Sequence, residues 1–428
     1  WSPARGDDAK LPVLVYFHSG GFAAGDGSEG RYDGASLAAR GIVVVTVNSR
    51  LGVFGFLALP EAALGSSHGA AGNYGLLDQH AALRWVQENI AQFGGDPKQV
   101  TIGGQSTGSM AVSAHMASPL SRGLFARAIG ESGGAFAPTK FWRRSQAENA
   151  AAQFAEHFGT QSLQELRSIS AEKLLAATEP DHKPVFSFWP HIDGNFLPDT
   201  PESVYLSGAQ AHVPLLLGTN SQERDFRLVL AGSAPTPENW HHVMRQLFRE
   251  RTEQALTFYP GTDTDEVMRS GTALAGDLFT SHGAWRWMDL HRKTGRAPVY
   301  FYRYTHARPA AVPTQQSNDN PRLITGAVHG AEIEYALGNL RHSPLYAWRA
   351  EDHEVSRVFS GYIAQFVKTG DPNDRGLPDW PAVSEERRGI ARQVIDTGTH
   401  TTWDDSGTKQ ALMQQFFADR ISHKDEDR

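Results

Sequence analysis

Short, continuous runs of β-branched and aromatic residues recur along this chain, with longer helix-compatible stretches between them. Such runs are typical of parallel strands that are covered on both faces, because these strands have no solvated side to impose alternation with polar residues. Over residues 75–93, between two of the runs, leucine, valine and isoleucine recur near helical spacing. The alternation predicts a doubly wound α/β fold with a mostly parallel central sheet and helices on both faces. The expected strands are 13–17, 42–47, 100–102, 125–129, 213–217 and 298–302.

Two segments interrupt this alternation, residues 139–210 and residues 225–295. Both are rich in helix formers and aromatic residues and lack strand signals. They are expected to be helical excursions over the sheet that form a cap or the walls of a substrate gorge. Residues 308–321 indicate a long loop. Because α/β proteins of 428 residues are often one domain, a single domain over 1–428 is expected.

Composition and charge exclude several kinds of partner. The chain carries 40 basic and 47 acidic side chains, for a formal net charge of −7. A mildly acidic chain without charge clusters argues against nucleic acid or an anionic membrane as partner, and no stretch approaches the roughly 20 apolar residues of a membrane span. Without cysteine the chain has no disulfide, thiol nucleophile or thiolate metal site. The compartment and the oligomeric state stay open.

The pattern G-x-S-x-G occurs three times, around Ser67, Ser106 and Ser132. Only Ser106 has an apolar run before it and small, helix-compatible residues after it. That strand–turn–helix context is what makes the pattern a nucleophile elbow, in which flanking glycines allow a crowded, strained turn. Ser67 has no strand ahead of it, and Pro138 interrupts the helix that would follow Ser132. Ser106 is therefore the expected nucleophile, and the other two serines are expected to be loop hydroxyls.

A serine nucleophile needs an oxyanion hole, and the stretch after the first expected strand offers one. Residues 18–22 read His-Ser-Gly-Gly-Phe and resemble the H-G-G-G loops whose backbone N–H groups bind a developing oxyanion. The expected donors are the N–H groups of Gly20, Gly21 and Thr107. His18 itself is expected to be a structural hydrogen bonder.

The spacing of the residues leaves the acid and the base of a triad open. Glu223 and Asp225 both follow the fifth expected strand, and spacing alone does not choose between them. Among eighteen histidines, His329 follows the sixth expected strand and precedes a glycine, whereas His306 lies nearer the strand end. His329 has a modest advantage as the base.

Several motifs along the chain carry a resemblance to a known family. They are residues 1–3 (WSP), 18–22 (HSGGF), 48–57 (NSRLGVFGFL), 72–79 (GNYGLLDQ), 93–97 (FGGDP), 124–129 (LFARAI) and 369–373 (TGDPN). Together and in this order they resemble the type-B carboxylesterase/cholinesterase family. The resemblance covers residues 1 to about 385.

The resemblance implies an α/β-hydrolase fold and ester hydrolysis. In the family the acid is a glutamate in a G-x-N-x-x-E segment, which falls on Glu223, and the base lies in H-G-x-E-x-x-Y, which falls on His329. The order Ser106, Glu223, His329 is the one that this fold requires. Ser132 corresponds to a serine in a structural segment. The implied mechanism forms an acyl-enzyme with a small-molecule ester and needs no metal or organic cofactor.

Three departures from the family pattern are visible. The family usually has G-E-S-A-G, where this chain has Gln105 and Thr107. The family also has an N-terminal β segment ahead of the W-T-P-like motif, whereas this chain begins at Trp1, without a methionine or a signal peptide. Trimming of that segment, by processing or otherwise, is the expectation.

Two other kinds of function are compatible with this fold, an inactive binding protein and a hydrolase of amides or lactones. A catalytically inactive adhesion or scaffold relative would lose triad members, and all three candidates are present. An amidase or a lactonase uses the same triad and is the nearest alternative. The adjacent His241 and His242 lack H-E-x-x-H spacing, which argues against zinc.

A few residues near the candidate triad bear on the charge of the substrate. Gln105 removes a carboxylate beside the nucleophile, and Arg224 and Arg227 follow the candidate acid. These residues suggest tolerance for esters that carry a free carboxylate, although arginines paired on the surface explain the pattern more simply. Aromatic residues that either line a gorge or lie in the core are Phe186, Phe188, Trp189, Phe226, Trp285 and Trp287, and the candidate contacts among them are Phe188, Trp189 and Phe226.

Overall fold

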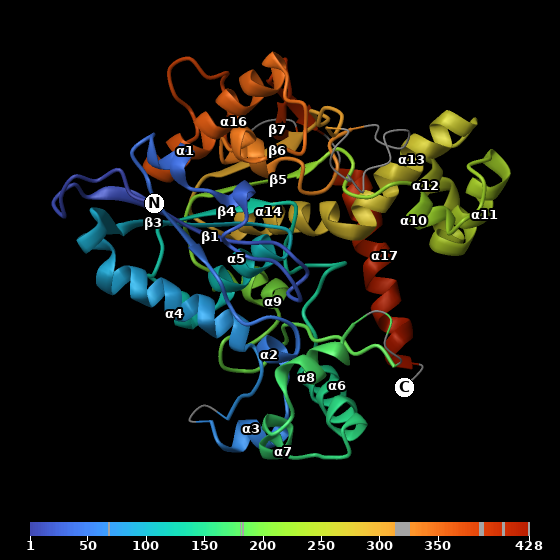
Figure 1. Ribbon diagram of the computed structural model, residues 1–428. Coiled ribbons are helices and arrows are strands. Elements are labelled where there is room, and N and C mark those ends of the chain that lie inside the picture. Colours follow the sequence, from blue (N-terminus) through green and yellow to red (C-terminus); the bar gives the residue numbers. More distant parts are fainter. Residues whose placement is uncertain are drawn as a thin grey trace.

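The computed structural model describes residues 1–66, 69–179, 181, 184–312, 326–384, 389–404 and 407–426, the side chains up to residue 420. Within these residues one sheet of eight strands forms in the order β2-β1-β3-β4-β5-β6-β7-β8 (Figure 1). Neighbouring strands are parallel except for the β7–β8 pair. The strands are Leu11–Phe17 (β1), Val43–Val47 (β2), Gly95–Gln105 (β3), Arg127–Glu131 (β4), Leu215–Asn220 (β5), Val299–Tyr304 (β6), Ile390–Ile395 (β7) and His400–Asp404 (β8).

The six strands expected from the sequence correspond to β1–β6, so the prediction of a mostly parallel α/β sheet is confirmed. The sequence analysis missed β7 and β8. Both strands mix apolar with polar residues, and β8 has no buried residue. Because they form the antiparallel edge of the sheet, they lack the continuous apolar run that marks a doubly covered strand.

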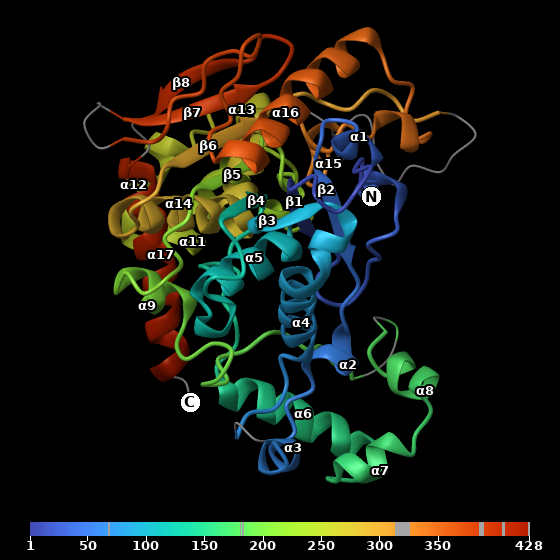
Figure 2. The ribbon, with the colours of Figure 1, turned by 90° about the vertical axis from the view of Figure 1, so that its left-hand side faces the viewer.

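Alternate residues of the central strands enter two separate cores, which explains why the strands are apolar throughout. In β1, Val13, Val15 and Phe17 face one core and Leu14 and Tyr16 face the other. Helices α4 (Tyr74–Asn89), α5 (Thr107–Ala117), α9 (Pro201–Leu206) and α14 (His282–Thr294) contribute to the first core, and α15 (Ile333–Ala336) and α16 (Ala350–Thr369) to the second. Figure 2 shows α16 above the sheet and α4 and α5 below it.

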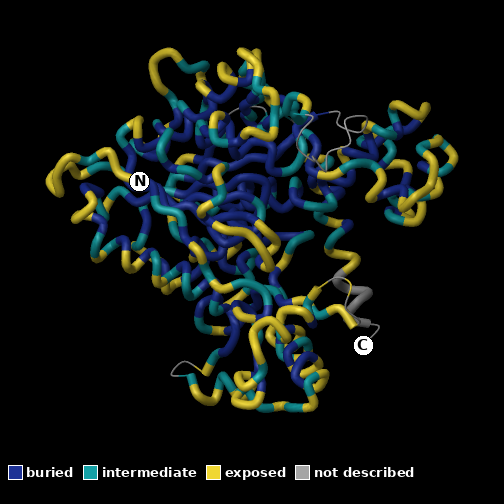
Figure 3. Tube along the Cα trace, in the orientation of Figure 1, coloured by how far each residue is buried: buried dark blue, intermediate teal, exposed yellow. Residues whose placement is uncertain are grey.

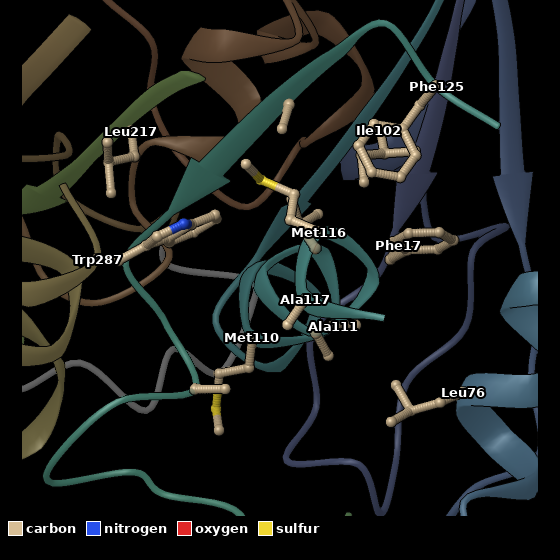
Figure 4. Close-up of a cluster of buried hydrophobic side chains, with 14 of the residues drawn as sticks. Phe17, Leu76, Ile102, Met110, Ala111, Met116, Ala117, Phe125, Leu217 and Trp287 are labelled. Atoms are coloured by element: carbon tan, nitrogen blue, oxygen red, sulfur yellow. The ribbon is translucent and has the colours of Figure 1, made fainter. Parts of the chain in front are cut away.

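The first core surrounds the helix that follows β3. Every residue of α5 is buried, and Figure 4 shows this helix between Leu76 of α4, Phe17 of β1 and Trp287 of α14. The Trp287 Nε1–H donates to the Tyr205 hydroxyl at 2.8 Å, so the polar atom of this buried ring is satisfied. The start of α5 is therefore held from several sides.

The two segments expected to be helical excursions contain helices and none of the eight strands of the described sheet. Residues 139–210 contain α6 (Arg144–His157), α7 (Leu163–Arg167), α8 (Ala171–Ala176) and α9. Residues 225–295 contain α10 (Arg227–Leu230), α11 (Pro237–Phe248), α12 (Thr252–Phe258), α13 (Thr264–Gly276), a π-helical stretch η5 (Asp277–Ser281) and α14. Helix α14 packs on β5 and β6, so the end of the second segment covers the sheet.

Helices α10 to α13 form a core of their own with the C-terminal helix α17 (Gly407–Glu426). Trp240, Met244, Tyr259 and Phe416 are buried in it. In Figure 1 these helices lie at the right, while α6, α7 and α8 extend below the sheet. Figure 3 shows exposed and intermediate residues mixed with buried ones along these outer segments, whereas the sheet is buried.

The remaining elements are short. They are α1 (Ala35–Ala38), α2 (Gly52–Phe56), α3 (Pro60–Leu64) and the 3₁₀ turns Gly30–Tyr32, Ile90–Phe93, Pro119–Ser121, Arg249–Arg251 and Leu340–His342. Within the described ranges, no helix is long and apolar enough to cross a membrane.

Candidate active site

Ser106 occupies a strained turn between β3 and α5. Its backbone has φ 56° and ψ −119°, a conformation that is costly for a residue with a Cβ. A Cβ at Gly108 would lie 2.1 Å from the carbonyl oxygen of Phe17, and one at Gly104 would lie 2.5 Å from the carbonyl carbon of Gly108. The glycines on either side of Ser106 are therefore required by close backbone contacts.

Two further side chains form a hydrogen-bonded chain with this serine. His329 Nε2 lies 3.0 Å from Ser106 Oγ, and His329 Nδ1 lies 2.6 Å from Glu223 Oε2. Glu223 is buried, and its Oε1 also accepts the backbone N–H of Asn220 at 2.7 Å. Since an ionised carboxylate only accepts, we assign the proton of the neutral ring to Nδ1, which leaves Nε2 free to accept from the serine.

The acid and base loops are bound to each other directly. The backbone N–H of Gln222 donates to Ala327 O at 2.9 Å, and the backbone N–H of Ala327 donates to Ser221 Oγ at 2.9 Å. Asn220 Nδ2 donates to Val328 O at 2.8 Å. These bonds join the end of β5 to the loop that carries the histidine and set the distance between acid and base.

The competing candidates make other contacts, although Ser132 lines the same cavity as Ser106. His306 bonds to Asp352 at 2.7 Å and to Asp396 at 3.3 Å, while Asp225 pairs with Arg227 at 2.6 Å. Ser132 Oγ donates to the buried Glu332 Oε1 at 3.1 Å. Ser67 lies outside the described residues. The structure thus brings Ser106, Glu223 and His329 together and holds these competitors in separate contacts.

The glycine pair after β1 approaches the start of α5. Gly20 has φ +124° and Gly21 has φ +69°, and a Cβ at Gly20 would lie 1.9 Å from the carbonyl oxygen of Ala24. The Gly21 N–H donates to Thr107 Oγ1 at 3.1 Å. His18 Nδ1 lies 2.7 Å from Ser19 O. The loop and the helix N-terminus place backbone N–H groups and the positive end of the helix dipole beside Ser106.

A cavity of about 360 Å³ opens over these groups. Ser106, His329, Gly20, Gly21 and Thr107 line it. Its described lining residues include two arginines and no aspartate or glutamate. Two guanidinium groups therefore lie at the cavity wall, and that of Arg31 pairs with Glu29 at 2.9 Å.

The expected substrate contacts divide into two groups. Gln105, Trp189 and Arg224 line the cavity, whereas Phe188 and Phe226 are not among its lining residues. Phe188 is buried in the first core, and Phe226 packs against the separate core of helices α10 to α13.

The lining residues that were not predicted from the sequence include Arg31 and Phe279. The Phe279 ring makes an edge contact with the His329 ring at 5.0 Å, and the Arg224 guanidinium stacks on its face at 3.9 Å. No motif surrounds either residue, because each reaches the cavity only through folding of a distant segment.

Buried carboxyl groups lie behind the triad. Burial and then repulsion from Glu332 raise the pKa of Glu131, and burial followed by the charge of Glu223 raises the pKa of Glu332. Asn220 Nδ2 and Ser132 Oγ donate to Glu332. Both glutamates therefore ionise less readily than usual, which limits the negative charge crowded around the triad.

No group of three or more potential metal ligands occurs among the residues that the structure describes. The chemistry that this arrangement supports is acyl transfer to a serine, with a histidine as base and backbone N–H groups around the developing charge.

Comparison with known proteins finds esterases among the relatives of this chain. The model of the carboxylesterase family matches residues 1–414. The chain is 34% identical over 393 residues to the para-nitrobenzyl esterase of Bacillus subtilis (89% of this chain, 75% of that protein). It is 35% identical over 413 residues to carboxylesterase 5A of Canis lupus familiaris (91% and 68%). The solved carboxylesterase EST55 of Geobacillus stearothermophilus superposes with a TM-score of 0.78 at 30% identity, covering 96% of this chain and 84% of that one.

Proposed function

The chain belongs to the carboxylesterase family and is a carboxylic ester hydrolase, and from that premise we propose that it works through an acyl-enzyme formed on Ser106. His329 Nε2 removes the hydroxyl proton as Ser106 Oγ attacks the ester carbonyl carbon. The carbonyl π pair moves onto oxygen, and the N–H groups around the glycine pair and the start of α5 stabilise that charge. Glu223 holds the ring and stabilises the imidazolium.

The second half of the reaction uses the same groups. The tetrahedral intermediate collapses, the bond between carbon and the leaving oxygen breaks, and the proton on His329 passes to the leaving alkoxide. Water then attacks the acyl carbon, giving its proton to His329, and collapse returns that proton to Ser106 Oγ. The net reaction consumes one ester and one water and releases one alcohol and one carboxylic acid.

One observation supports this proposal more strongly than any other observation. The hydrogen-bonded chain from Glu223 through His329 to Ser106, with distances of 2.6 and 3.0 Å, ends on a serine held in a strained turn. A general base has to lie about 2.6–3.2 Å from the proton that it removes. Strain of this kind persists only where the surrounding structure over-determines it, and it occurs often at active sites.

Labelling with a fluorophosphonate probe tests the nucleophile. We expect one label per chain, mapped by peptide mass spectrometry to the peptide that contains Ser106. Ser106→Ala should abolish labelling, and the matched control Ser132→Ala should retain it. A label on Ser132 or Ser67, or no label on the folded wild-type protein, would contradict the proposal.

We further propose that the enzyme accepts esters whose acyl part carries a free carboxylate. Arg224 lines the cavity, as does Arg31, which also pairs with Glu29, and no described acidic side chain lines it. Gln105, which is buried beside the nucleophile, is neutral. Arg227 does not support this proposal, because it is not among the residues that line the cavity and it pairs with Asp225. Charge-assisted hydrogen bonds between guanidinium and carboxylate would hold such a substrate.

A matched pair of substrates tests this specificity, p-nitrophenyl pentanoate and mono-p-nitrophenyl glutarate. Arg224→Ala should lower kcat/KM for the glutarate by roughly threefold to tenfold and leave the pentanoate unchanged. The control Arg227→Ala should change neither value. Equal effects of Arg224→Ala on both esters, or a wild-type enzyme that rejects the glutarate, would refute the carboxylate proposal.

A further inference from the structure

Thr107 contacts the glycine loop through its side chain as well as through its position at the start of α5. Its Oγ1 accepts the N–H of Gly21 at 3.1 Å, and both residues line the cavity above Ser106. Thr107 is 6% exposed, so this hydroxyl lies inside the site and is shielded from bulk water. As the first residue of α5, it is held by a helix in which every residue is buried.

This contact lowers the number of backbone N–H groups that are free to bind the oxygen of the reacting carbonyl. Gly21 has one N–H, and that N–H is used by Thr107 Oγ1. A threonine hydroxyl that accepts one hydrogen bond still has its own proton to donate. In the described part of the chain, no protein atom accepts this proton.

We propose that the Thr107 hydroxyl is a donor of the oxyanion hole, and that it takes the place of the Gly21 N–H. The proposal rests on the esterase mechanism given above. The chain of donation runs from Gly21 N–H to Thr107 Oγ1, and from the Thr107 O–H to the oxyanion. The N–H groups of Gly20 and Thr107 complete the hole.

The hydroxyl gains strength from the bond that it accepts. Hydrogen bonds in a chain polarise one another, so donation from Gly21 makes the Thr107 O–H a better donor. No proton leaves Thr107 during the reaction. When Ser106 Oγ bonds to the carbonyl carbon, the π pair moves onto oxygen and the O–H bonds to that charge. When the intermediate collapses, the pair returns and the bond weakens.

The family's usual residue at this position is alanine, which makes the assignment testable. In Thr107→Ala the Gly21 N–H loses its internal acceptor and is free to reach the oxyanion directly. In Thr107→Val a methyl group replaces the hydroxyl at the same volume, so the O–H is lost and the Gly21 N–H is still covered. Thr107→Ser keeps the hydroxyl. The three variants therefore separate the hydroxyl from the size of the side chain.

The measurement is kcat and KM on p-nitrophenyl butyrate, with active enzyme counted by the end point of fluorophosphonate labelling. Removal of one oxyanion-hole donor typically costs about 10²–10³-fold in kcat. We expect Thr107→Val to lose roughly 100-fold in kcat with little change in KM, and Thr107→Ala to lose roughly tenfold or less. Thr107→Ser should retain most of the activity that Thr107→Val loses.

A transition-state analogue supplies a second readout that a structural role would not change. A trifluoromethyl ketone adds to the serine and places an oxyanion in the hole, so its affinity should fall in parallel with kcat/KM across the variants. Any one of three results would overturn the inference. They are a wild-type kcat in Thr107→Val, equal losses in Thr107→Ser and Thr107→Val, and a Thr107→Ala variant that is faster than wild type. Absence of label on Ser106 in the wild type would instead refute the esterase mechanism itself.

Discussion

Protonation of one buried histidine is expected to destabilise this protein in mild acid. His115 lies in the last turn of α5, stacked on Phe17 at 5.3 Å, and is fully buried. Its Nδ1 contacts Ser121 Oγ at 2.8 Å and its Nε2 contacts Gln79 Oε1 at 3.2 Å, so the neutral ring is satisfied. Burial lowers the pKa of His115 from 6.5 to about 3.

The sign and size of the effect follow from this shift. The folded state holds the ring neutral down to about pH 3, whereas the unfolded chain binds a proton below pH 6.5. Stability is therefore unaffected above pH 6.5 and falls as the pH drops from there towards 3. pH 5 lies about 1.5 units below the pKa of the histidine in the unfolded chain. Protonation of that histidine therefore stabilises the unfolded chain by about 2 kcal/mol at this pH.

Urea unfolding of wild type and His115→Gln, at pH 7.5 and pH 5.0, measures this contribution. Glutamine retains a neutral amide but does not titrate. The loss of unfolding free energy between the two pH values should be about 2 kcal/mol smaller in His115→Gln than in wild type. The control His353→Gln, at an exposed position of α16, should lose as much as wild type. If His115→Gln also loses as much as wild type, the buried neutral ring is not the cause.

Three further predictions concern the site and its supports. Glu223→Gln should lower kcat by about 10⁴-fold, because an amide neither holds the His329 tautomer nor stabilises its cation, and a loss under tenfold in ester hydrolysis assays would contradict this. Lys409 binds the buried Asp277 at 2.7 Å, so Lys409→Met should cost about 3–5 kcal/mol in urea unfolding. An added Asp277→Asn should restore most of that loss, and no restoration would argue against an uncompensated charge. Gly108→Ala should cost about 3 kcal/mol or more, because its Cβ would lie 2.1 Å from the carbonyl oxygen that ends β1, and calorimetry with an unchanged Tm would disprove that clash.

The parts of the fold that the sequence predicted are those that depend on adjacent residues. Strands β1 to β6 are continuous apolar runs because both of their faces are buried. Strands β7 and β8 were not predicted, because they form an antiparallel pair at the edge of the sheet. Such a pair tolerates polar residues such as Arg392, Gln393 and Thr402. Helix α14 was assigned to an excursion, since its sequence alone does not show that it packs on the sheet.

The candidate site divides in the same way. Ser106 was distinguished from Ser67 by the strand before it and from Ser132 by the helix after it, which are properties of a few neighbouring residues. Gln105, Trp189 and Arg224 of the cavity wall were predicted, whereas Arg31 and Phe279 were not, because they belong to segments without a recognisable motif. The orientation of the Thr107 hydroxyl towards Gly21 depends on how the glycine loop approaches α5.

Neighbouring residues are enough to predict the alternation of strands and helices, the glycine-flanked turn at Ser106 and the glycine pair after β1. Each of these features depends on the backbone dihedral angles and the burial of a few adjacent residues. The choice of Glu223 over Asp225 and of His329 over His306 rested on resemblance, and only the tertiary structure decided which of them meet. Glu223 lies 106 residues from His329, and Ser106 lies 223 residues from it. They come together because parallel strands end at one edge of the sheet, where distant loops share a single cavity.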